Sequence, residues 1–192
     1  MRKIISAMQI SVDGYIEDPE AKQDWVENWE DDYGLLDQVD LCILGSGMYP
    51  DYEQYWTEAL DPESKLPSSG KLPTTQEVEY ARWATKTPHI LVSHQPQNVN
   101  WKNTRVIPDL EEIRNLKGGS GKDIYLIGGA LLVANMINLE LVDELRLMIN
   151  PVLLGGGKAL FKGLTERHKL KLISSEQKEL GRVYVAYSVQ HT

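Results

Sequence analysis

Cysteine is almost absent from this chain of 192 residues, which contains Cys42 as its single thiol. One cysteine cannot form an intrachain disulfide, and its place inside the apolar run LCIL is typical of a core residue. The four histidines show no metal-ligand spacing, so we expect no metal site. No apolar run approaches the roughly 20 residues of a membrane-spanning helix, and we expect a cytoplasmic protein that does not bind membranes.

Basic residues are also scarce, because 20 lysines and arginines stand against 28 aspartates and glutamates, which leaves a formal net charge of −8. The sequence contains no dense cluster of cations. Binding to nucleic-acid phosphates depends on clustered lysine and arginine, so we expect no nucleic-acid partner. An anionic ligand must instead find its positive partners locally, at helix ends and a few side chains.

The N-terminal segment superficially resembles a signal peptide, since two basic residues precede an apolar run. The apolar part is short, and Ser6, Gln9 and Ser11 interrupt it before an Asp-Gly turn. Residues 3–10 therefore predict the first core strand. The chain length and the hydrophobic content of 42% predict one domain with a single core.

The chain is organised around residues 123–157, where a strand, a pair of glycines and a helix follow one another. Residues 124–127 predict a buried strand, and residues 130–137 predict a helix. Gly128 and Gly129 lie between them. Glycines let the backbone approach a ligand closely, and the free N–H groups at a helix start attract an anion. This order favours a phosphate site, but a tight turn also explains an isolated glycine pair, so other segments must decide.

The other elements alternate between strands and helices and predict an α/β fold with a mainly parallel central sheet covered on both faces. The predicted strands are residues 40–44, 89–92, 104–107 and 142–149. The predicted helices are residues 25–39, 49–56, 74–85 and 109–116, with Asp109 and either Thr74 or Thr75 as caps. Two further strands, residues 170–180 and 182–190, predict a C-terminal antiparallel hairpin.

Three predicted strands end in glycine or small polar residues, namely at Gly45-Ser46-Gly47, Ser93-His94 and Gly128-Gly129. The carboxyl ends of parallel strands lie along one edge of a sheet, where ligands bind in such folds. The three ends together favour a shared nucleotide site. Two rival glycine motifs fail, because residues 117–122 do not match a P-loop and residues 155–160 do not match a Rossmann fingerprint.

Several segments resemble the dihydrofolate reductase-like superfamily. Within it, the chain is similar to the reductase domain at the C-terminus of the bifunctional riboflavin-biosynthesis deaminase/reductase, the RibD C-terminal domain. The similar segments are ISVDGYI, DLCILGSGMY, ILVSH, IYLIGGALL and LVDELRLMINPVLLGGGKALF. The resemblance implies a three-layer dihydrofolate reductase-like fold and hydride transfer from NADPH to a small heterocyclic or ring-opened substrate.

The resemblance also implies which residues bind NADPH. The family segment that cradles the pyrophosphate is matched by Gly128, Gly129, Ala130, Leu131 and Leu132. The segment beside the adenosine ribose and phosphates is matched by Gly45, Ser46, Gly47 and Met48. The strand end that meets the 2′-phosphate is matched by Ser93 and His94, and the positions near the nicotinamide are matched by Ile16 and Trp25.

Two departures from the riboflavin-type pattern bear on the substrate. Ile127 stands where riboflavin reductases carry a glutamate that contacts substrate. Those reductases hold a ribose phosphate with arginines from the first helix, whereas this region is acidic here and would repel an anion. A pterin needs one carboxylate on this helix, and Glu30 or Asp31 lies near the matching place. The acidic cluster is otherwise typical of a solvated helix face.

No general acid stands out in the sequence. A fold does not determine an activity, so a non-catalytic nucleotide-binding protein is the alternative to a reductase. Riboflavin-type domains commonly pair through the C-terminal hairpin, so the resemblance implies a homodimer with a shared two-fold patch. The alternative is a monomer whose sheet edge is shielded by Lys169, Lys171 and Arg182.

Overall fold

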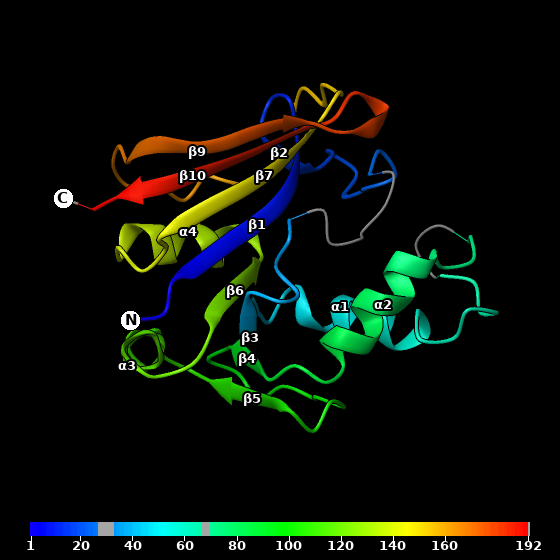
Figure 1. Cartoon of the computed structure of the whole chain (residues 1–192), viewed down its shortest axis with the longest axis horizontal. Helices are drawn as coiled ribbons and strands as arrows, with labels where there is room; N and C mark the ends of the chain where they lie inside the picture. The colour runs from blue at the N-terminus through cyan, green and yellow to red at the C-terminus, as the bar shows by residue number, and fades with distance from the viewer. Residues whose placement is uncertain (27–32, 67–69, 192) are drawn as a thin grey trace.

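The structure is a computed structural model that describes residues 1–26, 33–66 and 70–191. Within these residues the main sheet contains β1 (Ile4–Ser11), β3 (Val39–Gly45), β4 (His89–Val92), β5 (Thr104–Ile107), β6 (Asp123–Gly128), β7 (Glu144–Asn150), β9 (Lys169–Gln177) and β10 (Val183–Gln190). The strand order is β5-β4-β3-β6-β1-β7-β10-β9 (Figure 1). Along this order, all neighbouring strands from β5 through β4, β3, β6 and β1 to β7 pair in parallel. Strand β10 is antiparallel to both of its neighbours, β7 and β9. The expected mainly parallel sheet with a C-terminal antiparallel hairpin is confirmed.

Helices cover both faces of this sheet, as Figure 1 shows. The α-helices of the described residues are α1 (Tyr49–Glu58), α2 (Thr75–Ala84), α3 (Glu111–Gly118) and α4 (Ala130–Asn138). Ile113 of α3 and Val133 of α4 belong to one core cluster, whereas Trp56 of α1 and Ala81 of α2 belong to another. The sheet therefore separates two helix layers, which gives the three-layer arrangement. No helix in the described part of the chain combines the length and apolar character that crossing a membrane requires.

Strand β1 lies near the middle of the sheet, and all of its residues are buried. Ile4 and Met8 pack in the cluster on the α3 and α4 face, whereas Ile5 and Ala7 pack in the cluster on the α1 and α2 face. Successive side chains of a strand point to opposite faces. Because both faces are covered, the segment is mostly apolar and shows no strict alternation, and its polar residues Ser6, Gln9 and Ser11 are buried as well.

The predicted start of α2 is confirmed, and that of α3 is displaced by one residue. Thr74 is the N-cap of α2, and its side chain accepts a hydrogen bond from the Glu77 backbone N–H at 3.1 Å. The Glu77 carboxylate accepts one in return from the Thr74 N–H at 2.8 Å, which completes a capping box. The N-cap of α3 is Leu110 instead of Asp109. Asp109 still accepts a hydrogen bond from the Glu111 N–H at 2.8 Å.

The helix predicted over residues 25–39 is wrong in the part that the structure describes. Residues 33–38 contain turns, and Val39 already begins β3. Gly34 has a φ of +67°, a left-handed conformation that an α-helix cannot include without a break. Glu30 and Asp31, the proposed substrate carboxylates, lie outside the described residues.

A two-stranded sheet, which the sequence did not predict, joins β2 (Tyr15–Glu17) to β8 (Lys158–Ala159) in antiparallel pairing. Its strands follow β1 and β7, respectively. A side chain on Gly157, just before β8, would overlap the backbone carbonyl of Glu17. The last of the three consecutive glycines therefore allows two backbone segments to pack together.

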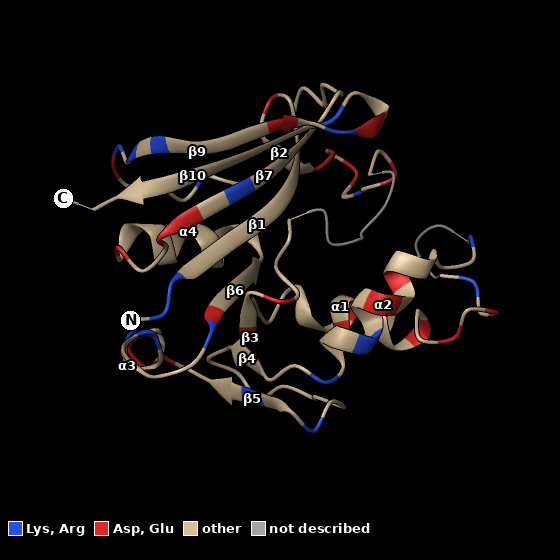
Figure 2. Cartoon of the chain, in the orientation of Figure 1, with Lys and Arg blue, Asp and Glu red and all other residues tan. Residues whose placement is uncertain are grey.

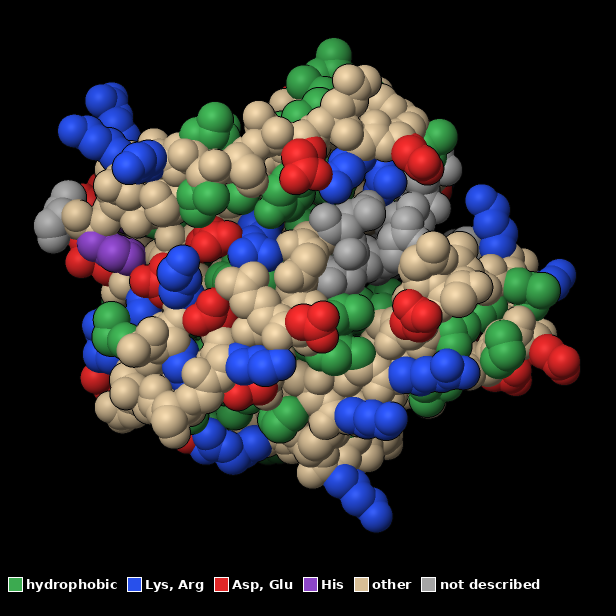
Figure 3. All heavy atoms as spheres, in the orientation of Figure 1, with side chains coloured by type: hydrophobic (Ala, Val, Ile, Leu, Met, Phe, Trp, Pro, Cys, Tyr) green, Lys and Arg blue, Asp and Glu red, His purple; other side chains and the backbone are tan. Residues whose placement is uncertain are grey.

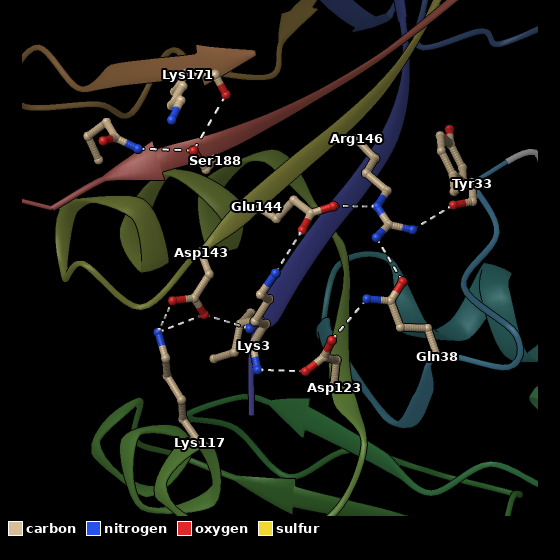
Figure 4. Close-up of polar contacts among 12 residues, drawn as sticks. Lys3, Tyr33, Gln38, Lys117, Asp123, Asp143, Glu144, Arg146, Lys171 and Ser188 are labelled. Carbon is tan, nitrogen blue, oxygen red and sulfur yellow. Dashed lines mark hydrogen bonds and ion pairs between the residues drawn. The ribbon is translucent and has the colours of Figure 1, made fainter. Parts of the chain in front are cut away.

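The N-terminal edge of the parallel strands carries a network of charged groups (Figures 2 and 4). The Asp143 carboxylate accepts hydrogen bonds from the Ile4 N–H and the Lys117 ammonium group, both at 2.8 Å. The Asp123 carboxylate accepts one from the Lys3 N–H at 2.8 Å. These groups hold the strand starts and α3 together, so their role is structural. On the face drawn in Figure 3, acidic and basic side chains are interspersed.

Candidate functional site

The ends of β3 and β6 meet at the carboxyl edge of the sheet, because these strands are parallel neighbours. A Cβ atom built on Gly45 would lie 3.7 Å from the Cβ atom of Leu132 and 3.8 Å from the carbonyl oxygen of Gly128. The glycine that ends β3 therefore contacts both the glycine pair and the first turn of α4. Two segments that are far apart in the sequence form one surface.

Gly128 occupies a space and a backbone conformation that favour glycine. Its φ is +132°, which side-chain-bearing residues rarely adopt. A Cβ atom at this position would lie 2.6 Å from Met8 Cε and 3.6 Å from Met48 Sδ. The backbone at Gly128 is therefore packed against one methionine from β1 and another from the segment before α1.

Gly129 and Gly47 face open space, since a Cβ atom built on either would meet no atom of another described residue within 4 Å, chain neighbours aside. Gly129 is the N-cap of α4, and Met48 is the N-cap of α1; neither helix start has a side-chain cap. The first N–H groups of a helix lack partners within it, and the positive end of its dipole lies there. Two uncapped helix starts, one beside exposed Gly47 and the other at half-buried Gly129, fit an anionic phosphate group.

The end of β4 lies beside this surface, because the Ser46 N–H donates a hydrogen bond to the Val92 carbonyl at 3.2 Å. Ser93 is buried, and its hydroxyl donates to the Gln95 carbonyl at 2.9 Å and accepts from the Gln95 N–H at 3.1 Å. Ser93 therefore shapes the loop after β4. His94 is exposed and is the more accessible of the two residues predicted to meet the 2′-phosphate.

The remaining residues that were predicted to bind the cofactor lie in two separate regions, the surface around α4 and a cavity at the end of β7. Ala130 and Leu132 belong to the same core cluster as Ile16, whereas Leu131 is 70% exposed on the first turn of α4. Trp25 instead lines a separate cavity at the end of β7. The structure therefore brings Ile16, but not Trp25, into the cluster beneath the glycine pair.

Ile127 lines a cavity of about 60 Å³ on the α1 and α2 side of the sheet. The other lining residues are Ala7, Met8, Gln9, Tyr33, Met48, Tyr52, Trp56, Tyr80 and Tyr125. None of these described residues is an acid or a base of the Asp, Glu, His, Lys or Arg type. Met8 and Met48 also contact the position of Gly128, so the cavity adjoins the glycine surface. The sequence indicated only one part of this cavity, the aromatic residues that α1 contributes, Tyr52 and Trp56.

Two tyrosines of this cavity, Tyr52 and Tyr80, stay uncharged at neutral pH. Burial raises the pKa values of Tyr52 and Tyr80 well above that of a free tyrosine. Their hydroxyl oxygens lie 3.3 Å apart, so one donates a hydrogen bond to the other. The cavity therefore offers apolar and aromatic surface with neutral hydrogen-bonding groups.

Glu53 is a buried acid on α1, but it already has several partners. Its carboxylate accepts hydrogen bonds from the Tyr49 hydroxyl at 2.6 Å and from the Asn100 and Trp101 N–H groups at 2.8 Å. Burial raises the pKa of this carboxyl, but the hydrogen bonds outweigh burial and leave the pKa below its ordinary value. Glu53 is therefore an ionised anchor for the loop before β5, and not a proton donor.

Asp13 holds the loop after β7 against the end of β1. Its carboxylate accepts hydrogen bonds from the Ser11 hydroxyl at 2.6 Å, the Gly155 N–H at 2.8 Å and the Leu154 N–H at 3.2 Å. The bonds from Ser11 and then Gly155 lower the pKa of Asp13. The sequence suggested a turn at this position, but it did not indicate a contact with residues so far along the chain.

Comparison with known proteins identifies relatives over nearly the whole chain. The family model described as "RibD C-terminal domain" matches residues 2–184. The "Uncharacterized protein YyaP" of Bacillus subtilis (strain 168) is 32% identical over 189 residues, which cover 97% of this chain and 94% of that protein. The "Uncharacterized protein YwjB" of the same organism is 28% identical over 181 residues, which cover 92% of each chain.

Solved structures share the fold. A Shewanella sp. PV-4 protein named for riboflavin biosynthesis superposes with a TM-score of 0.72 at 21% identity, covering 98% of this chain and 99% of that one. The diaminohydroxyphosphoribosylaminopyrimidine deaminase/5-amino-6-(5-phosphoribosylamino)uracil reductase of Thermotoga maritima gives a TM-score of 0.67 at 15% identity, covering 98% of this chain and 57% of that one. These likenesses confirm the expected three-layer α/β fold.

Proposed function

The chain belongs to the family of the RibD C-terminal domain, and from this membership we propose that it is an NADPH-dependent reductase of a small heterocyclic or ring-opened substrate. The observation that carries the proposal is the surface at Gly129. Open space lies there, in front of the uncapped start of α4 and beside the end of β3. A reductase-type role is consistent with the family and with the reductase named among the structures that share its fold.

The residues at the carboxyl edge fit the cofactor that the family resemblance implies. Gly129 and Gly47 would let the pyrophosphate approach the backbone, and the starts of α4 and α1 would supply positive dipole ends and N–H donors. His94 would meet the 2′-phosphate. When bound, NADPH supplies the hydride, whereas the protein supplies binding, orientation and electrostatics.

Met8 and Met48 connect the cofactor surface to the aromatic cavity, since both contact the Gly128 position and both line the cavity. The proposed substrate site includes this cavity, which at about 60 Å³ holds only part of a ring, and Ile127 forms part of its wall. The methionines would separate the substrate from water on the side of the glycines. A polarisable thioether packs well against planar rings, so these residues would also orient a planar substrate.

The walls of the cavity favour an uncharged planar substrate. A phosphate dianion loses its hydration on entering an apolar site, and such burial is costly without a paired cation. The described lining residues include no lysine or arginine, and Ile127 replaces the carboxylate of riboflavin reductases. We therefore expect 5-amino-6-(5-phosphoribosylamino)uracil to be a poor substrate.

A second candidate function is nucleotide binding without catalysis. It is favoured by the absence of an acidic or basic side chain among the described residues that line the aromatic cavity. A reductase with this cavity would need water or the substrate itself to supply the proton. The two functions differ in turnover and not in cofactor affinity.

Steady-state oxidation of NADPH with a panel of pterins, pyrimidines and small carbonyl compounds tests the proposal. We expect turnover of at least one uncharged ring substrate, and none when Gly129→Val replaces the natural protein. NADPH binding without turnover of any panel member would favour the non-catalytic alternative. Efficient turnover of the phosphoribosyl compound would contradict the assignment of the aromatic cavity as the substrate site.

A further inference from the structure

A cavity of about 210 Å³ lies at the carboxyl end of β7, next to the connection between β9 and β10. It is lined by Trp25, Asn150, Pro151, Val152, Leu180 and Arg182. These residues are distinct from those of the aromatic cavity that contains Ile127. An apolar cavity of about 150 Å³ accommodates benzene, so this space can hold one six-membered ring with small substituents, but not a nucleotide.

The side chain of Asn150 presents a buried acceptor that lacks a donor. Asn150 is 2% exposed, and its Nδ2 group lies 3.4 Å from the Ile10 carbonyl oxygen and 3.5 Å from the Met148 carbonyl oxygen. Backbone carbonyls only accept hydrogen bonds, so the amide nitrogen must face them, and Oδ1 must point the other way. Asn150 Oδ1 is buried and has no hydrogen-bond partner among the described residues.

Trp25 presents the complementary group. Its indole Nε1 is buried and also lacks a hydrogen-bond partner within the described part of the chain. An indole N–H is a donor and never an acceptor. Two residues in the wall of one cavity therefore leave one donor and one acceptor unsatisfied, and such groups destabilise a protein unless a ligand or water completes them.

We propose that this cavity binds a small planar lactam, a ring that carries a carbonyl group and a ring N–H. The carbonyl would accept the hydrogen bond from Trp25 Nε1, and the ring N–H would donate to Asn150 Oδ1. Pro151 and Leu180 provide apolar surface for the ring. The guanidinium side chain of Arg182, which is 4% exposed, favours the electron-rich carbonyl end. The site does not depend on the proposed reductase activity.

The simplest probe is 2-pyridone, which has one carbonyl and one ring N–H. Its matched control is 1-methyl-2-pyridone, which keeps the carbonyl and the ring but lacks the donor. Each is titrated into ¹⁵N-labelled protein without cofactor, while the tryptophan indole signals are followed by NMR. Loss of one signal in Trp25→Phe identifies the Trp25 resonance, and Trp56→Phe identifies a reporter in the aromatic cavity.

We expect 2-pyridone to shift the Trp25 indole signal and to leave that of Trp56 unchanged. The methylated compound should bind about tenfold more weakly, because the buried Asn150 oxygen stays unsatisfied. Asn150→Leu should remove the difference between the two compounds. A second variant, Trp25→Phe, tests the donor if Asn150→Leu does not fold. We expect it to weaken 2-pyridone binding as well, measured through the backbone N–H signal of Val152 in the cavity wall.

Three results would overturn the proposal. The first is an unmoved Trp25 signal at saturating 2-pyridone, which would mean that the cavity holds only water. The second is equal affinity for both compounds. The third is a shift of the Trp56 signal alone, which would place the ligand in the aromatic cavity. None of these measurements uses NADPH or turnover, so a failed reductase assay would leave them unchanged.

Discussion

Gly128 and Met8 are packed so closely that a Cβ atom on the glycine would lie 2.6 Å from the methionine Cε. A Cβ atom on the adjacent Gly129 would meet nothing within 4 Å in the part of the chain that the structure describes, apart from its chain neighbours. The first glycine of the pair therefore permits the packing of β6 against β1, and the second leaves space at the start of α4. The two roles can be separated by mutation.

Replacing each glycine tests this division. Gly128→Ala should lower the free energy of unfolding by about 1–3 kcal/mol, because alanine is strained at a φ of +132° and must displace Met8. Gly129→Val should fold normally, since the φ of Gly129 is −79° and its surroundings are open, but it should not bind NADPH. Urea denaturation and a fluorescence titration measure the two effects. Normal NADPH affinity in folded Gly129→Val would exclude the pyrophosphate role.

Cofactor preference tests the end of β4. The protein should bind NADPH more tightly than NADH, because exposed His94 can meet the extra phosphate. His94→Ala should reduce NADPH affinity about tenfold and leave NADH affinity unchanged, as expected for one hydrogen bond to a charged group. His191→Ala is the matched control, since His191 lies beside Asp143 at the opposite edge of the sheet. Equal affinities of the natural protein for the two cofactors would contradict the assignment.

His89 predicts a pH dependence of stability. Burial lowers the pKa of His89 from 6.5 to about 4, and its Nδ1 lies 2.7 Å from the Thr87 carbonyl oxygen. Because the folded pKa is below the unfolded one, protonation favours unfolding. Stability should be full above pH 6.5 and should fall as the pH drops toward about 4, by up to about 3 kcal/mol.

The variant His89→Phe separates this effect from that of the carboxylates. Phenylalanine fits between the rings of Tyr52 and Trp101, and the Thr87 carbonyl keeps its hydrogen bond from Asn103. Denaturation at a series of pH values should show that the natural protein loses more stability than the variant between pH 6.5 and 4. Parallel curves for the two proteins would refute the buried neutral histidine.

The sheet edge leads us to propose a homodimer. Strand β9, and not β10, forms the edge, and Leu170, Leu172 and Ile173 on it are 43%, 54% and 53% exposed. Arg182 is buried, so it cannot shield the edge as the monomer alternative required. Exposed apolar edge strands tend to be paired or covered.

Light scattering at micromolar concentration should give twice the chain mass of 21.8 kDa. Leu172→Glu should give the mass of one chain, because a charge on the shared patch appears twice in a two-fold interface. Leu139→Glu, at an exposed site after α4, is the control and should stay dimeric. A natural protein with the mass of one chain would disprove the dimer.

The sequence alone determined the elements whose signals are local. The apolar run before Gly128 predicted a buried strand, and the glycine pair predicted the helix start that follows it. Thr74 and Glu77, three residues apart, determine the start of α2 by bonding each other's backbone. Such features depend on neighbours within a few residues, so a pattern in the sequence is sufficient to predict them.

Only the tertiary structure decided which of these elements meet. Gly45 contacts Gly128 because β3 pairs with β6 and not with β1, a strand order that local patterns do not encode. The aromatic cavity also exists only after folding, since its walls come from β1, β6, α1 and α2. The segment around Gly34 shows that a local pattern can also mislead. Its apolar spacing predicted a helix over residues 25–39, but Gly34 has a left-handed φ that an α-helix cannot include. Packing between distant segments, which sequence periodicity does not report, determines the candidate site.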